Sequence, residues 1–201
     1  MESSPEEKLG IPSYYFETSD LVIIALFAAL GGVFSSVIAN IANLFNTAVT
    51  GGGQLFAGLH VFWFVLVYFL TRRKAGAVIL AGIIKGLIEL FMGNPLGIIV
   101  VIIAIGEATV FEIVILILSK LITQKYDNVR IVLAAGGATS TNMIILLSIL
   151  LSKGLPPELI LLMLIFSFIS GIIFGGYFGI FISHIFQQSG LLDWRKEVEE
   201  T

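Results

Sequence analysis

Residues 20–45 read DLVIIALFAALGGVFSSVIANIANLF, and no charged residue lies between Asp20 and Phe45. A helix of about 18 or more apolar residues is long enough to cross the hydrocarbon core of a bilayer. Thr18 and Ser19 precede the run together with Asp20, and their side-chain oxygens suit a helix N-terminus because they can accept hydrogen bonds from its free N–H groups. This segment predicts that the chain is an integral membrane protein.

The same apolar pattern recurs along the rest of the chain. Apolar runs between polar segments predict membrane-spanning helices at 20–45, 54–71, 75–92, 97–120, 130–152 and 157–186. The chain has 201 residues, of which 57% are hydrophobic and 12% charged, and its mean hydropathy is +1.02. Soluble domains carry about twice that share of charged residues. We therefore expect an all-α integral membrane protein with a bundle of about six transmembrane helices.

Basic residues are distributed unevenly between the two sides of this predicted bundle. Nine of the eleven Lys and Arg residues fall on one side, namely Lys8, Arg72, Arg73, Lys74, Lys120, Lys125, Arg130, Arg195 and Lys196. Because cytoplasmic loops are enriched in Lys and Arg, this pattern predicts that both termini are cytoplasmic. The expected organisation is a cytoplasmic N-terminal segment at 1–19, a six-helix transmembrane domain at 20–187 and a cytoplasmic tail at 188–201.

Composition and motifs argue against several classes of protein. The chain has no cysteine, a net charge of −3 and no basic block, so we expect no thiolate metal site and no nucleic-acid partner. It has no Walker lysine loop, no His-Glu-x-x-His zinc motif and no Gly-x-Ser-x-Gly elbow. We therefore expect neither a cofactor nor an enzyme with an ATPase activity of its own.

Charged residues at membrane depth are the first candidates for a functional site, because each costs at least a few kcal/mol unless it is paired or solvated. Lys85 and Glu89 lie four residues apart and share a face of the third predicted helix. The helical rise places Lys85 and Glu107 near the midplane and Glu89 in the outer half. Lys85 could pair with either glutamate. The cluster is either a structural polar lock or part of an outward cavity in which Glu89 accepts hydrogen bonds from a ligand.

Further polar residues are predicted at a similar outer depth. They are Asn40 and Asn43 on the first helix, His60 and Trp63 on the second, Asn94 before the fourth and Asn142 on the fifth. Amides, an imidazole and an indole on the wall of a mostly apolar pocket can hold a small aromatic ligand. Each residue alone is more commonly an interfacial or packed side chain. Their shared depth with Glu89 nevertheless predicts a ligand-binding site.

Small residues form two further patterns. The last predicted helix carries one at every fourth position, namely Ser167, Gly171, Gly175 and Gly179. Such a stripe lets helices approach closely, and it indicates internal packing more than a dimer interface. Ala25 and Ala29 form a flat face on the cytoplasmic half of the first helix. That face is either packed internally or a docking surface for another membrane subunit.

These features together resemble the substrate-binding (S) component of energy-coupling-factor (ECF) transporters, which has six helices, a helix-one alanine pair and an outer polar ring. The stretch from Trp63 to Gly97 is most similar to the YkoE-type thiamine or hydroxymethylpyrimidine components. The matching residues are Arg72-Arg73-Lys74-Ala75-Gly76-Ala77, Ile88-Glu89-Leu90 and Gly93-Asn94-Pro95-Leu96-Gly97. Ala75 replaces a proline of the family pattern, and Leu96 replaces an aromatic residue. Residues 106–111 resemble a later Gly-x-x-Glu-x-x-Phe element loosely.

The resemblance implies a high-affinity binding subunit of an ATP-driven vitamin importer, multi-pass in the plasma membrane and surrounded by lipid. It implies that thiamine or its hydroxymethylpyrimidine precursor is captured from outside, in a pocket closed by the loop around Gly51-Gly52-Gly53. Glu89 is the family-matched ligand contact, and Trp63 would stack on a flat ring. Ala25 and Ala29 would dock on a transmembrane coupling subunit driven by two cytoplasmic ATPase subunits.

Two other interpretations of the residues stay open. One is a stand-alone proton- or ion-coupled secondary transporter in which Lys85, Glu107 and Glu112 form a relay. The other is a membrane assembly subunit whose small-residue faces serve only its partners and which binds no small molecule.

Overall fold

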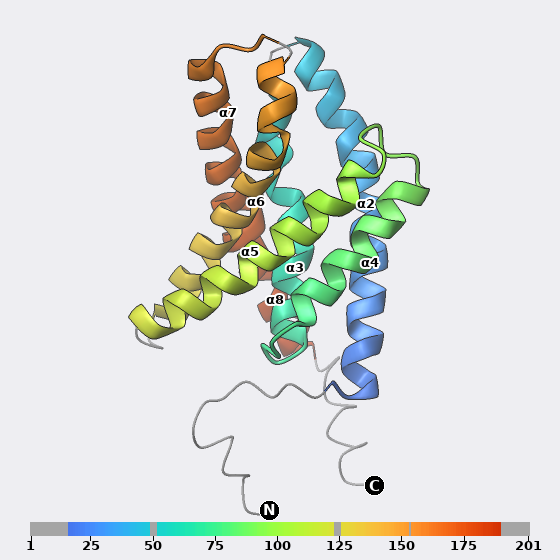
Figure 1. The fold of residues 1–201 in the computed structure, drawn as a ribbon. Coiled ribbons are helices and arrows are strands. Elements are labelled where there is room, and N and C mark those ends of the chain that lie inside the picture. The colour runs from blue at the N-terminus through green and yellow to red at the C-terminus, as the bar shows by residue number, and fades with distance from the viewer. Residues whose placement is uncertain (1–15, 49–51, 123–125, 153, 190–201) are drawn as a thin grey trace, which may run out of the picture.

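The computed structural model is a bundle of long helices that run roughly between two ends, with α4 and α5 strongly inclined to the others (Figure 1). It describes residues 16–48, 52–122, 126–152 and 154–189. Its elements are α2 (Thr18–Ala48), η1 (Gly52–Phe56), α3 (Gly58–Leu70), α4 (Ala77–Phe91), α5 (Ile99–Leu121), α6 (Asp127–Ser152), α7 (Pro157–Ser170), η3 (Gly171–Tyr177) and α8 (Phe178–Gln188). No strand occurs within these described ranges.

The six predicted spans correspond to α2, η1–α3, α4, α5, α6 and the continuous run α7–η3–α8. Among the described residues, five segments are long and apolar enough to cross a membrane: Thr18–Phe45, Gly52–Leu70, Ile99–Leu121, Asp127–Leu147 and Pro157–Phe186. The apolar helix α4 is shorter, at 15 residues, and it packs chiefly against α5 and α2. The predicted all-α membrane bundle is confirmed.

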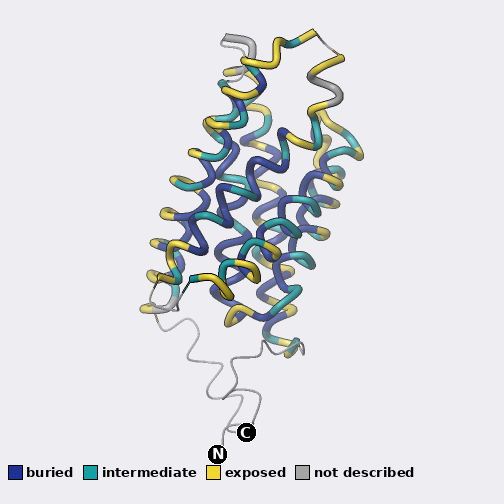
Figure 2. Tube along the Cα trace, turned by 60° about the vertical axis from the view of Figure 1, so that its left-hand side comes forward, coloured by how far each residue is buried: buried dark blue, intermediate teal, exposed yellow. Residues whose placement is uncertain are grey.

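The outer surface of the bundle is apolar. Buried residues line the interior, and exposed positions recur along the outside of the helices (Figure 2). The exposed positions include Leu26 (53% exposed), Ile102 (56%) and Leu161 (59%). Large exposed apolar side chains on several helices would be unfavourable in water, but they match a hydrocarbon environment.

The connections lie at two ends of the bundle. The α3–α4 and α5–α6 connections lie at one end with the start of α2 and the end of α8, and the other three connections lie opposite (Figure 1). We call the first the basic end, because the described residues Arg72, Arg73, Lys74, Lys120 and Arg130 belong to it. That the basic end is cytoplasmic stays a prediction. The four other basic residues assigned to this side lie outside the described residues.

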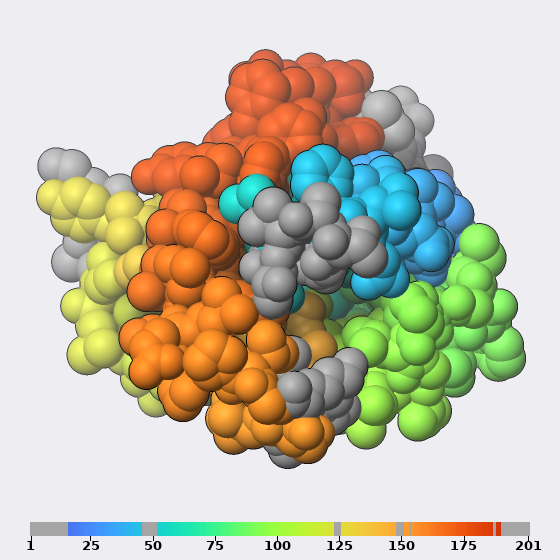
Figure 3. Space-filling view, turned by 90° about the horizontal axis from the view of Figure 1, so that it is seen from above, coloured from blue at the N-terminus to red at the C-terminus, as the bar shows by residue number. Residues whose placement is uncertain are grey.

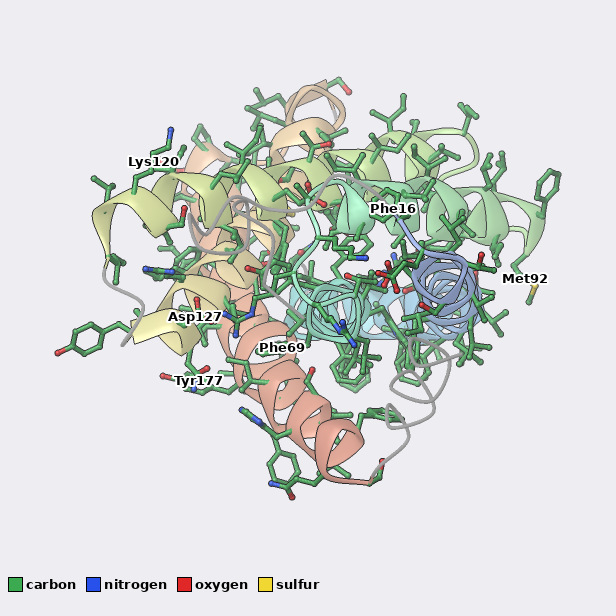
Figure 4. The ribbon with its side chains drawn as sticks, turned by 90° about the horizontal axis from the view of Figure 1, so that it is seen from below. Phe16, Phe69, Met92, Lys120, Asp127 and Tyr177 are labelled. Carbon is green, nitrogen blue, oxygen red and sulfur yellow. The ribbon has the colours of Figure 1, made fainter. Side chains whose placement is uncertain are left out.

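Ion pairs join three elements at the basic end. Lys74 lies 2.6 Å from Asp20 and 3.1 Å from Glu17, and Arg73 lies 2.5 Å from Asp127. Burial disfavours the charged form of Lys74, but the hydrogen bonds to Asp20 and then Glu17 outweigh it and raise the Lys74 pKa. Because the pKa is raised, these bonds stabilise the fold fully at pH values below the usual lysine pKa. Their contribution is lost as the pH rises through the pKa of Lys74 in the folded state. Figure 4 views this end.

Glu112 caps α4 from a neighbouring helix. Its carboxylate on α5 accepts hydrogen bonds from the backbone N–H groups of Gly76 (2.8 Å), Val78 (2.9 Å) and Ile79 (3.2 Å). The first N–H groups of a helix have no partner within the helix, and a negative charge there is favourable. The Glu112 carboxylate therefore links α5 to the start of α4 through three backbone hydrogen bonds.

The stripe of small residues on the last span packs inside the bundle, as predicted. A Cβ added at Gly171 would lie 2.1 Å from Thr139 Oγ1, and one added at Gly179 would lie 2.8 Å from Val65 Cγ1. Ser167 Oγ donates a hydrogen bond to the Thr139 carbonyl at 2.9 Å. These close approaches join the last span to α6 and α3. The segment Gly171–Tyr177 is π-helical, which the sequence pattern did not predict.

Candidate functional site

A cavity of about 220 Å³ lies near the end of the bundle opposite the basic end. Its walls come from α2, η1, α3, α4, the α4–α5 connection, α5 and α6. Figure 3 looks onto this end, where α2 in blue, the α4–α5 region in green and α6 in orange surround the middle. Asn43 and Leu96 line the cavity and are also exposed, so the cavity reaches the protein surface.

Seven of the nine side chains that the sequence assigns to a ligand site line this cavity. They are Asn43, His60, Lys85, Glu89, Asn94, Glu107 and Asn142. These residues come from five helices and one connection, and only the folding of the bundle brings them together. These seven residues, which the sequence places at a similar depth in the membrane, line the same cavity in the structure.

Trp63 and Asn40 do not line the cavity. The indole of Trp63 packs against Gly31 of α2, where an added Cβ would lie 2.8 Å from Trp63 Cγ. The absence of a side chain at Gly31 provides the space for the indole between α2 and α3. Asn40 is exposed, and its amide nitrogen donates to the Ser36 carbonyl of its own helix at 3.0 Å. These two residues are therefore not among those that the fold brings to the cavity, and their contact with a ligand stays a prediction.

The α4 side of the cavity carries a closed polar network. Lys85 forms an ion pair with Glu89, four residues later on the same helix. Asn94 Nδ2 donates to the second oxygen of Glu89 at 3.3 Å, and Asn94 Oδ1 accepts from the N–H of Leu96 at 3.0 Å. Lys85 also lies 5.4 Å from the centroid of the Phe64 ring. The partner of Lys85 is therefore Glu89 rather than Glu107.

The sequence of α4 explains why its charged face lies close to α5. A Cβ at Gly82 would lie 2.5 Å from Ala108 Cβ, and one at Gly86 would lie 3.0 Å from Val101 Cα. After α4, Gly93 adopts a φ of 76°, a left-handed conformation that glycine tolerates without strain. This turn brings Asn94 back beneath the last turn of α4, within reach of Glu89.

The opposite side of the cavity holds acceptors without partners. Glu107 on α5 is only 2% exposed, and no described residue donates a hydrogen bond or forms an ion pair to it. Asn142 Oδ1 on α6 and Gln54 Oε1 on η1 are buried and lack hydrogen-bond partners in the described structure. Buried polar atoms are normally hydrogen-bonded, so acceptors without protein partners around one cavity are places where water or a ligand can donate hydrogen bonds.

Gln54 is the site residue that the sequence analysis missed. It lies in η1, and its neighbour Gly53 also lines the cavity. Ser170 holds the end of η1 in place, since its hydroxyl accepts from Gly58 N–H at 2.9 Å and donates to the Leu55 carbonyl at 2.7 Å. The one sequence signal was an isolated amide directly after three glycines. Gly51, assigned to the loop that closes the pocket, lies outside the described residues.

The cavity does not present an evident metal site. In the part of the chain that the structure describes, no group of three or more His, Cys, Asp and Glu side chains is placed to hold a metal ion. His60, Glu89 and Glu107 all line the cavity but do not form such a cluster. The polar lining instead offers separate hydrogen-bonding groups on different walls.

The predicted docking alanines lie on the outer face of α2. Ala25 is exposed and Ala29 is partly exposed, and exposed Leu26 and Leu30 flank them. They lie in the half of α2 nearer the basic end, away from the cavity (Figure 1). Ala25 and Ala29 are therefore not packed inside the bundle, and their role as a docking surface stays a prediction.

Comparisons with known proteins point to transport. A family model described as "ABC-type cobalt transport system, permease component" matches residues 19–142. A solved structure described as "Crystal structure of an S-component of ECF transporter" is similar over 92% of this chain and 94% of that chain, with a TM-score of 0.79 and 22% sequence identity. No curated protein matches the chain. The bundle described above is thus the fold of an ECF S component.

Proposed function

The chain belongs to the family of permease components of ABC-type cobalt transport systems, and on that premise we propose that it is the substrate-binding subunit of an ECF importer. It is a multi-pass protein of the plasma membrane. The observation that carries the proposal is the polar-lined cavity that reaches the surface at the end opposite the basic residues. With the basic end in the cytoplasm, this cavity opens outward, as capture of an external nutrient requires.

The ligand that we propose is thiamine or its hydroxymethylpyrimidine precursor. A flat heterocycle with an amino group matches a cavity in which Glu89, Asn142 and Gln54 offer acceptor oxygens. The volume of about 220 Å³ lies just below the roughly 300–1,000 Å³ typical of small-molecule pockets, which suits a compact ligand. The family description names cobalt, but a metal ion needs several coordinating side chains at one point. The described polar groups of the cavity lie apart on different walls, which fits an organic molecule better.

Thiamine is expected to raise the melting temperature of the purified protein in detergent, because a ligand that binds only the native state stabilises it by mass action. Glu89→Gln is expected to weaken binding about tenfold, since it removes a charge-assisted acceptor from the cavity wall. It also leaves Lys85 without its partner and lowers stability, so each thermal shift is taken relative to the ligand-free melting temperature of the same variant. The measurement is a thermal-shift titration with thiamine, hydroxymethylpyrimidine, other vitamins and Co²⁺.

Asn40→Ala is the matched control, because Asn40 is polar and exposed but lies outside the cavity, and it should bind like the wild type. A shift with Co²⁺ alone would contradict the organic ligand and make the metal the substrate. A panel without any shift would contradict the binding function and favour an assembly subunit.

The partners that we propose are a transmembrane coupling subunit and two cytoplasmic ATPase subunits. The exposed face of α2 around Ala25 and Ala29 is the proposed contact with the coupling subunit. Small side chains let two membrane helices approach closely, and this stabilises their contact by van der Waals packing. A bulky residue at Ala25 would separate the two helices.

Ala25→Trp is expected to reduce co-purification of the coupling subunit severalfold and to leave the thiamine-induced thermal shift intact. The measurement is affinity purification after co-expression with the coupling subunit and ATPases of the source cell. Leu161→Trp introduces the same bulk on the exposed face of α7 and should change neither result. Normal assembly of the Ala25→Trp protein would exclude this face as the docking surface.

A secondary transporter remains the second candidate, but the position of Glu112 does not favour it. A relay needs carboxylates that can change partners, whereas Glu112 accepts three backbone hydrogen bonds at the start of α4. Thiamine uptake into liposomes that contain this chain alone, without ATPases, would support the secondary transporter against the proposal.

A further inference from the structure

We propose that Glu107 is the residue that selects the charge of the ligand, and that the cavity binds an organic cation in preference to a neutral molecule of the same shape. This inference rests on the proposed binding function and deepens it, because it separates the two candidate ligands by charge. Thiamine carries a permanent positive charge on its thiazolium ring, whereas its hydroxymethylpyrimidine precursor is neutral near pH 8.

The negative charge of Glu89 is already matched within the protein. Lys85 forms an ion pair with one of its oxygens, and Asn94 donates to the other. Both partners are buried and come from α4 or the turn that follows it, so the network is complete before a ligand arrives. A ligand can still contact Glu89, but a cation gains little there, since the Lys85 ammonium repels it.

The carboxyl group of Glu107 has no such partner. Only 2% of Glu107 is exposed. Among the described residues, none donates a hydrogen bond to its carboxyl group or forms an ion pair with it. Of the charged side chains that line the cavity, two are carboxylates and one, Lys85, is an ammonium. Because Lys85 is paired to Glu89, the cavity carries one net negative charge whenever Glu107 is ionised.

A buried carboxylate without a partner is costly, and a cation beside it removes that cost. In the free protein Glu107 avoids this cost by binding a proton, and a positively charged ligand can take the place of that proton. A neutral ligand of the same shape would fill the cavity but could not take the place of the proton. Preference for a cation follows from the arrangement of the charges and does not depend on any one hydrogen bond.

The unpaired amide oxygens define the rest of the ligand. Asn142 Oδ1 and Gln54 Oε1 are both acceptors, and they come from α6 and η1, on different elements from Glu107. Acceptors on separate walls require a ligand with several N–H or O–H donors at its edges. The cavity thus fits a compact organic monocation with amino or hydroxyl donors, a description that thiamine meets and a simple inorganic cation does not.

The test compares thiamine with deazathiamine, the neutral analogue in which carbon replaces the thiazolium nitrogen. Isothermal titration calorimetry on the purified full chain in detergent gives the ratio of the two dissociation constants for each variant. The wild type is expected to bind thiamine about tenfold to a hundredfold more tightly, as the strength of charge-assisted interactions suggests. Glu107→Gln should lose this preference through weaker thiamine binding and keep its affinity for deazathiamine within about threefold.

Two further variants make the result specific. Glu107→Asp keeps the charge and should retain most of the preference, while Glu158→Gln removes an exposed carboxylate of α7 and should leave it unchanged. A wild-type protein that binds both molecules equally, or a Glu107→Gln protein that keeps the wild-type ratio, would overturn the inference and leave the binding function standing. If neither molecule binds to the wild type, the proposed thiamine-binding function fails and the inference fails with it.

Discussion

Replacing Lys85 with methionine is expected to destabilise the protein by about 3–5 kcal/mol, because removal of one partner from a buried ion pair leaves the other charge uncompensated. Lys85 and Glu89 are both almost fully buried, at 1% exposure each. Without the ammonium, the carboxyl groups of Glu89 and Glu107 would line one cavity whose described walls hold no other Lys or Arg side chain. The loss is measurable as a lower midpoint of unfolding in detergent.

The double variant Lys85→Met, Glu89→Met is the control for this prediction. Replacement of a whole buried pair by apolar residues of similar volume is often neutral or stabilising, so the double variant should recover most of the lost stability. The two single substitutions would then be strongly non-additive, as expected for residues in direct contact. Additive losses, or a Lys85→Met protein as stable as the wild type, would show that the pair does not form in the folded protein in detergent.

The ion-pair partner of Lys85 could not be predicted from the sequence alone. The spacing of Lys85 and Glu89 on one helix face could be read from the sequence, and so could the depth of Glu107 on the next span. The choice between the two partners could not, because it depends on how α4 and α5 pack around Gly82 and Gly86. It also depends on the turn at Gly93, which brings Asn94 to the second oxygen of Glu89.

The spans themselves were predictable because hydrophobic length is a property of the sequence. The bounds of α5 and of the α7–α8 run agree with the predicted segments to within a few residues. The π-helical turns at Gly171–Tyr177 were not predicted, since no local signal marks them. They occur where glycines meet Gly58 and Thr139, contacts between residues far apart in the chain.

The sequence named seven residues that line the cavity, but it did not define which residues form the boundary of the cavity. Polar residues at one depth were good candidates, because each buried polar group in a membrane needs a reason to be there. Depth alone cannot say which way a side chain points, however, and so Trp63 and Asn40 were included although one packs on Gly31 and the other bonds to its own helix. Gln54 was missed because its place on the cavity wall depends on the way Ser170 fixes η1.

Gly58→Ala is expected to destabilise the bundle by about 3 kcal/mol, at the upper end of the usual cost of overpacking a core. A Cβ at this position would lie 2.0 Å from the backbone carbonyl oxygen of Ser170 and 3.0 Å from the nitrogen of Gly171. A flexible side chain could move aside, but here the neighbour is the backbone of a helix. Thermal unfolding in detergent, followed by circular dichroism, measures the loss.

Gly137→Ala is the matched control, because it makes the same change within a helix of the same bundle. Its added Cβ would meet only Val114 Cγ2 at 3.7 Å and Val110 Cγ1 at 3.9 Å, which are ordinary contacts. Alanine is a better helix former than glycine by about 1 kcal/mol, so this variant should be as stable as the wild type or more stable. Equal stability of the two variants would mean that the start of α3 is not in backbone contact with the junction between α7 and η3.

Gly58→Ala is also expected to weaken ligand binding, because the clash falls at the point where Ser170 holds η1. Separation of α3 from the end of α7 would lengthen the hydrogen bond from Gly58 N–H to Ser170 Oγ, and that hydroxyl also donates to the Leu55 carbonyl. Gln54 would then lose its fixed position on the cavity wall. A Gly58→Ala protein that unfolds earlier but binds thiamine normally would show that η1 is positioned by other contacts. A joint loss would show that the close helix crossing supports both the fold and the cavity.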